Sequence, residues 1–175
     1  MTRISSSAKA SVRRKERSGG NALVEWMLVL LPTMALITAF FDIAFAMFSW
    51  ATIQNAVSEG CRYAITFQTI TGDGQDLSIK TKVANDSMGL LTVAGGLIHV
   101  DYYTQAAPTT SIATPNGNVP GNIVIVSVQS YPLNWMVPLS GTMASPFRST
   151  SPATVNVYAA SVLGAYPAGL SSVTR

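Results

Sequence analysis

The sequence holds little of what a metal site or a disulfide needs. Among its 175 residues there is one cysteine and one histidine. A single cysteine excludes a disulfide within the chain, and one cysteine with one histidine cannot supply the three or four nitrogen and sulfur ligands of a usual zinc site. Charged residues make up only 11% of the chain, against about 25% in an average soluble domain. The composition argues against a disordered acidic tail, a coiled coil and a metal-dependent enzyme, and no cofactor is expected.

The scarce positive charges gather at the N-terminus. Six of the eleven basic residues lie within residues 1–20, against one acid, Glu16, so this segment carries a net charge of +5 and the rest of the chain carries −2. Residues 1–20 have no apolar periodicity and predict an unstructured leader. They also lack interleaved aromatic residues and adjoin an apolar run. Membrane orientation and contact with anionic lipids therefore explain the charge better than nucleic-acid binding does.

A membrane-length apolar run follows the leader. Residues 26–41 are sixteen consecutive uncharged residues, extended by Ala22, Leu23 and Val24, which approaches the ~20 residues that span a bilayer core. The run predicts one transmembrane helix over about residues 22–42, with Asp42 at its outer boundary. The basic leader predicts a cytoplasmic N-terminus and an exported C-terminal part.

Apolar residues continue beyond Asp42 at helical spacing, and so the helix is expected to reach about residue 65. Trp50, Ile53, Val57 and Cys61 mark a stripe expected to pack on the exported domain. At 1.5 Å per residue, the helix would be roughly 65 Å long, about twice what a bilayer needs. Cys61 is interpreted as a small buried hydrophobic residue; an intermolecular disulfide outside the cell is the alternative.

Residues 66–175 are predicted to form an exported α+β domain. Alternating apolar residues predict strands at 97–103, 122–130 and 154–163. A turn at 72–76 is followed by a helix that is expected to end at Gly89, with residues recurring at a three-to-four spacing: Leu77, Thr81, Ala84, Met88 and Leu91. Residues 108–121 resemble a turn-rich connection, and 131–152 hold too many prolines for a central strand. The predicted fold is an antiparallel sheet packed on the amphipathic half of the long helix.

The most specific feature is the junction between leader and helix. Glu25 lies five residues after Gly20, at the start of the spanning segment. An acid at the membrane centre costs ~2.5–3.5 kcal/mol on insertion scales. Cleavage between Gly20 and Asn21 would place a new ammonium four residues before Glu25, on the same helix face. The cut would therefore create a partner for the acid, within the chain or on an adjacent helix.

This junction resembles the class III signal of type IV pilin-like proteins. Further along, GNALVEWMLVLLP, FFDIAFAMF and IQNAVSEGCRYAI resemble the TadE-like family of pilus assembly proteins, which are minor pseudopilins of the tight-adherence (Flp) system. The resemblance covers about residues 20–65. It implies a type IV pilin-like fold, Gly20 as the last leader residue, Asn21 as the mature N-terminus, and Glu25 as the acid needed for processing or assembly.

The resemblance also implies partners and a location. The expected partners are a prepilin peptidase, the tight-adherence assembly machinery, the major pilin and a second pseudopilin. The expected location is the bacterial inner membrane, crossed once, with the C-terminal domain periplasmic or extracellular and an association with the pilus. The implied role is structural and not enzymatic.

Other interpretations stay open. A glycine followed by a glutamate can arise by chance. Ala44-Phe-Ala46 matches a secretory cleavage pattern, which would release residues 47–175. A membrane-anchored binding module, such as an adhesin, could use Trp135, Met136 and Phe147 as a sticky surface, although these could equally cap the core. For an exported enzyme, His99 would have to act as a base, but its strand position predicts a solvated side chain.

Overall fold

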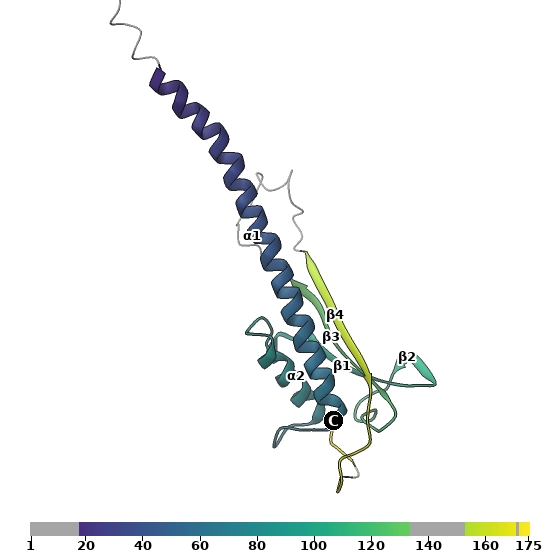
Figure 1. Ribbon diagram of the computed structural model, residues 1–175. Helices are drawn as coiled ribbons and strands as arrows, with labels where there is room; N and C mark the ends of the chain where they lie inside the picture. The colour runs from purple at the N-terminus through teal and green to yellow at the C-terminus, as the bar shows by residue number, and fades with distance from the viewer. Residues whose placement is uncertain (1–17, 134–152, 171) are drawn as a thin grey trace, which may run out of the picture.

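A computed structural model describes residues 18–133, 153–170 and 172–175. Its dominant element is α1 (Ser18–Ile65), 48 residues long, or about 72 Å at 1.5 Å per residue. The helix continues through Pro32, and one residue later the Thr33 hydroxyl donates to the Val29 carbonyl oxygen at 2.7 Å. The N-terminal half of α1 stands clear of the rest of the described chain, and the C-terminal half carries a small head (Figure 1).

The head contains a four-stranded antiparallel sheet in the order β2-β1-β3-β4. The strands are β1 (Ile98–Thr104), β2 (Ala107–Ser111), β3 (Ile123–Pro132) and β4 (Thr154–Val162). Strands β1, β3 and β4 confirm the three that were predicted. The edge strand β2 was not predicted, because it falls largely within the stretch interpreted as a turn-rich connection.

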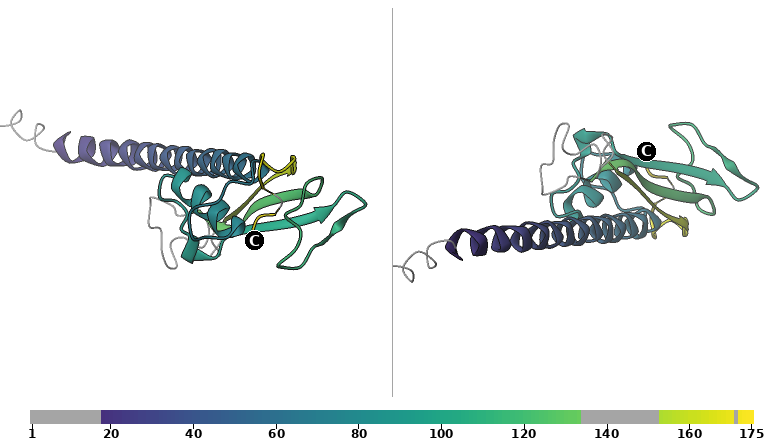
Figure 2. Two further views of the ribbon diagram at one scale, coloured as in Figure 1. Left: turned by 90° about the horizontal axis from the view of Figure 1, so that it is seen from below. Right: turned by 90° about the horizontal axis from the view of Figure 1, so that it is seen from above.

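The predicted alternation of the strands is present in the structure. Ile98, Val100 and Tyr102 of β1 lie opposite Val128, Val126 and Val124 of β3, and all six are buried. His99 points to the other face and is exposed, as predicted. The inner face of the sheet is therefore apolar, and α1 packs on it over β3 and β4 (Figure 2).

A second helix, α2 (Gln75–Asp86), packs on both α1 and β1 and is followed by the 3₁₀ turn η1 (Val93–Gly95). The predicted helix is present, but the spacing that predicted it does not mark its buried side. Leu91 is buried, whereas Leu77 is 42% exposed and Met88 is 77% exposed. The side of α2 that faces the core instead carries Gln75, Ser78, Ile79 and Val83. Two of these are polar. Gln75 forms hydrogen bonds with Ala64 and Asn118, and the Ser78 hydroxyl donates to the nearby Gly74 carbonyl oxygen and accepts from the Ile70 amide.

The core of the head joins α1, α2 and the inner face of the sheet. From α1 it receives Ile53, Ala56, Val57, Cys61 and Ala64. Of the stripe predicted for α1, Ile53, Val57 and Cys61 lie in this core, whereas Trp50 is 51% exposed and lies outside it. At 100° per residue, Trp50 lies about 60° around the helix from Ile53, and the smaller Ser49 occupies the buried face at that level.

Candidate functional site

The predicted processing residues occupy the free end of α1. Gly20, Asn21 and Glu25 all lie in its first two turns and all are exposed. Among the described residues, no side-chain or distant backbone atom lies within 4 Å of the position that a Cβ on Gly20 would take. Asn21 and Glu25 are four residues apart and therefore share one face of the helix. Within the part of the chain that the structure describes, these three positions are uncovered.

Beyond Glu25 the helix presents apolar side chains on all its faces. The exposed large hydrophobic residues run from Leu23 to Phe41, with Trp26 at 74%, Leu31 at 74% and Phe40 at 71%. A helix from Gly20 is long and apolar enough to cross a membrane, and its apolar segment is almost entirely uncovered within the chain. Such a surface is stable only in lipid or against other apolar helices.

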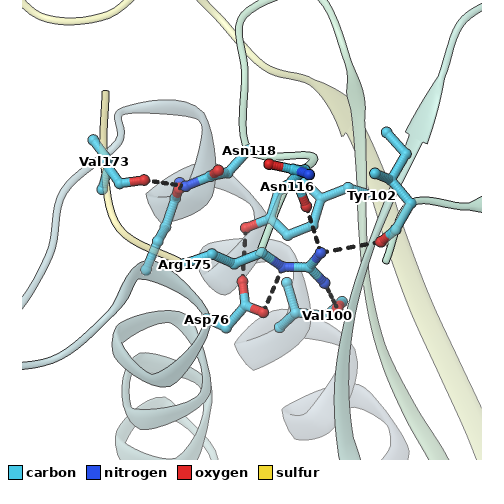
Figure 3. Close-up of polar contacts among 9 residues, drawn as sticks. Asp76, Val100, Tyr102, Asn116, Asn118, Val173 and Arg175 are labelled. Atoms are coloured by element: carbon cyan, nitrogen blue, oxygen red, sulfur yellow. Dashed lines mark hydrogen bonds and ion pairs between the residues drawn. The ribbon is translucent and has the colours of Figure 1, made fainter. Parts of the chain in front are cut away.

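A polar cluster that was not predicted from the sequence lies at the opposite end of the molecule, where α2 meets β1 (Figure 3). Arg175 lies at its centre. Its Nε is 2.8 Å from Asp76 Oδ2, and its side chain is only 5% exposed. The guanidinium also donates to the backbone carbonyl oxygens of Ile112, at 3.0 Å, and Asn116.

Tyr102 completes the centre of this cluster. Its hydroxyl donates to Asp76 Oδ1 at 3.0 Å, and the Arg175 guanidinium carbon lies 4.5 Å from the centre of its ring. Burial raises the pKa of Tyr102, and the neighbouring Asp76 carboxylate raises it further. The phenol therefore remains a neutral hydrogen-bond donor, which is a structural role.

A second set of hydrogen bonds extends the cluster to α1. Asn118 Nδ2 donates to Gln75 Oε1 and to the Val173 carbonyl oxygen, at 3.0 and 2.7 Å. Gln75 Nε2 in turn donates to the Ala64 carbonyl oxygen of α1 at 3.0 Å. The cluster thus fastens the C-terminal segment, α2 and the end of α1 to one another. No sequence motif signals it, because its members are far apart along the chain.

The remaining candidates offer no reactive centre. Cys61 is 4% exposed, and burial raises the pKa of its thiol, so the reactive thiolate is disfavoured. Among the described residues no group of three or more metal-ligating side chains comes together. Trp135, Met136 and Phe147, predicted as a sticky surface or a core cap, lie outside the described residues, as does the leader up to residue 17.

Comparison with protein families adds one finding. Residues 20–62 match the family model of the TadE-like proteins. This segment is TadE-like. The match confirms the resemblance predicted from the sequence, and it covers the predicted processing junction, the apolar run and most of the helical surface that packs on the head. It supports involvement in a tight-adherence pilus system and a structural role. Searches of curated proteins and of solved structures found no significant match.

Proposed function

We propose that this TadE-like chain is a minor pseudopilin of a tight-adherence pilus system, and that it acts in pilus assembly or initiation. In this proposal the helix crosses the inner membrane once, with the N-terminus in the cytoplasm and the head exported. A prepilin peptidase removes the leader after Gly20. The mature chain, beginning at Asn21, then meets the assembly machinery, the major pilin and other pseudopilins through its helix.

The observation that carries the proposal is the uncovered apolar helix beside a single acid. Glu25 is exposed on the same helix face as Asn21, and the residues after it are apolar and exposed on every side. An uncompensated carboxylate is costly in lipid, and an ammonium at a helix N-terminus one turn away offsets that cost electrostatically. The family match over residues 20–62 includes both positions.

Identification of the mature N-terminus tests this proposal. The protein is expressed in cells that contain a prepilin peptidase and, as a control, in cells that lack it. Intact-mass measurement and N-terminal sequencing then define the first residue. A chain that begins at Asn21 only in the presence of the peptidase supports the proposal. A chain that begins at Met47 would show secretory cleavage after Ala46, and a working chain that keeps its leader would also refute the proposal.

A further inference from the structure

The outward face of α1 remains apolar well beyond Asp42, where the sequence analysis placed the outer membrane boundary. Ile43 is 58% exposed, Met47 66%, Phe48 52% and Trp50 51%. Ala44 and Ala51 lie between them and are also exposed. At 100° per residue these six side chains fall within one arc of about 160°, on the side of the helix opposite Asp42. The described part of the head leaves this whole arc uncovered.

Asp42 does not mark the end of this apolar surface. Its side chain is on the face of α1 that is covered within the chain, and the residue is only 7% exposed. Ser49, two turns further on the same face, is fully buried. The charge that suggested a boundary therefore faces inward. The outward face of α1 becomes polar at a different position.

That change occurs just after Ala51. The outward positions that follow are Gln54 and Asn55, and then the ion pair of Glu59 with Arg62, whose side chains are 41% and 76% exposed. No charged side chain stands on the outward face between Glu25 and Glu59. Trp50 is the last large apolar residue before the polar part. Tryptophan is the residue typically found at the boundary between lipid and water.

The length of the apolar face fits a tilted helix in a bilayer. Trp26 and Trp50 are separated by about 36 Å along the axis at 1.5 Å per residue, and a hydrocarbon core is about 30 Å thick. A tilt of about 35° reconciles the two lengths and lies within the range of transmembrane helices. For a helix about 10 Å wide at this tilt, the side that faces away from the bilayer leaves it about five residues earlier than the side that faces the bilayer. The apolar face can therefore remain in lipid for several residues beyond the point at which the opposite face has left it.

We propose that the outward face of α1 from Ile43 to Trp50 lies in the outer leaflet of the bilayer. The helix is tilted where it leaves the membrane, and Trp50 lies at the lipid headgroups. The head packs on the side of the tilted helix that faces away from the bilayer. This inference rests on the membrane anchoring in the proposed function. Lipid is favoured over a second helix because the face continues the membrane-length run and is bulky. Helix pairs in membranes usually meet through small residues.

Fluorescence quenching by brominated lipids tests the inference on the full chain in phosphatidylcholine and phosphatidylglycerol vesicles. The chain has three tryptophans. Trp26→Phe with Trp135→Phe leaves Trp50 as the only emitter, and Trp50→Phe with Trp135→Phe leaves Trp26. With bromine near the headgroups, we expect quenching of Trp50 as large as that of Trp26. Bromine near the ends of the lipid acyl chains should quench Trp50 less than bromine near the headgroups does.

Comparison of lipid quenching at Trp26 and Trp50 distinguishes failure of this inference from failure of the membrane anchoring on which it depends. Quenching of Trp26 without quenching of Trp50 would leave the anchor in place and overturn the inference. If Trp50 is then quenched by aqueous iodide, its face lies in water; if neither quencher reaches it, another protein chain covers it. Absence of quenching at both tryptophans would refute the membrane anchoring itself.

Thiol labelling gives an independent measurement. Met47→Cys and the matched control Asn55→Cys are each made in a Cys61→Ala background and treated in vesicles with a membrane-impermeant maleimide. A thiol in lipid stays protonated and unreactive, so we expect Met47→Cys to react at least about tenfold more slowly than Asn55→Cys. Circular dichroism of both variants in lipid-free detergent checks that they fold. Equal rates in vesicles would overturn the inference.

Discussion

Arg175 and Asp76 form a buried ion pair, with Nε and Oδ2 2.8 Å apart, although 99 residues separate them in the sequence. The Arg175 side chain is 5% exposed and that of Asp76 is 23% exposed. Arg175 also reaches backbone carbonyl oxygens of the connection between β2 and β3. The pair therefore ties the last residue of the sequence to α2 and to the sheet.

Loss of the Asp76 charge should destabilise the head. Asp76→Asn leaves the Arg175 guanidinium buried without its counter-charge, and removal of one partner from a buried pair costs about 3–5 kcal/mol. The matched control is Lys82→Gln, which breaks the more exposed pair of Lys82 with Asp86 in the same helix and should cost less than about 1 kcal/mol. Denaturant unfolding of the full chain in detergent, followed by circular dichroism, measures both changes. Equal losses would contradict a special role for the Asp76 pair.

The raised pKa of Tyr102 predicts a loss of stability at alkaline pH. A group whose pKa is higher in the folded state than in the unfolded state contributes its full stability below its ordinary pKa, which is 10.0 for tyrosine. That contribution is lost as the pH rises above this value. The free energy of unfolding should therefore fall above about pH 10, and Tyr102→Phe should reduce the slope. Fluorescence-monitored unfolding across pH 8–11 tests this slope.

Tyrosinate absorbance tests the raised pKa of Tyr102 directly. In the folded chain, Tyr102→Phe should leave the absorbance gained at high pH unchanged, because the buried phenol stays protonated. In the denatured chain, the same substitution should remove the contribution of one tyrosine. An equal decrease in the folded and denatured chains would contradict the raised pKa of Tyr102.

Local periodicity explains why much of the fold could be predicted. Strand residues alternate between faces, so Ile98, Val100 and Tyr102 identified the inner face of β1 without knowledge of its neighbours. Strand β2 gave no such signal, because all five of its residues are exposed and Pro108 lies among them. An edge strand that buries neither face has no hydrophobic pattern to detect.

Long-range contacts explain what could not be predicted. Gln75 is fully buried on α2 because its amide binds Ala64 of α1 and Asn118, and helical periodicity treats a glutamine as a surface residue. The spacing of Trp50 likewise fits the buried stripe, yet Ser49 occupies the covered face of α1 at that level and Trp50 lies beside it. The junction at Gly20, Asn21 and Glu25 could be proposed from the sequence because its residues lie in adjacent turns of one helix.

Gly60 of α1 lies directly against Val83 of α2. A Cβ placed on Gly60 would overlap the Val83 side chain. Gly60→Ala gains about 1 kcal/mol of helix propensity, but overpacking of a core contact costs about 1–3 kcal/mol, so we expect a net loss of stability. Val83→Ala in the same chain should relieve the overlap. Denaturant unfolding of the two single variants and the double variant measures the coupling, and Asn55→Ala on the exposed face is the control for propensity. Additive effects would show that the helices separate freely.

Glu25 should be required for assembly of the filament. Glu25→Gln keeps the size of the side chain but removes the charge that would bind the ammonium of Asn21. Hydrogen bonds to charged groups are worth about 1.5–3 kcal/mol, which corresponds to a loss of roughly 10- to 100-fold in the contact. We expect a comparable decrease in surface pili, counted by electron microscopy. Glu59→Gln changes an acid in the head-bearing part of the same helix and should leave piliation intact. Normal piliation with Glu25→Gln would contradict the proposed role.

The burial of Cys61 predicts a thiol that neither reacts nor pairs. The residue is 4% exposed among Ile53, Val57 and the other core residues, and burial raises the pKa of its thiol. Because only the thiolate attacks a maleimide or a disulfide, alkylation of the folded chain should be at least about tenfold slower than alkylation of the denatured chain. Asn55→Cys in a Cys61→Ala background provides an exposed thiol on the same helix and should react quickly in both states. Non-reducing electrophoresis of the exported protein should show a monomer. A reducible dimer would favour the intermolecular disulfide, and it would require the core around Cys61 to open.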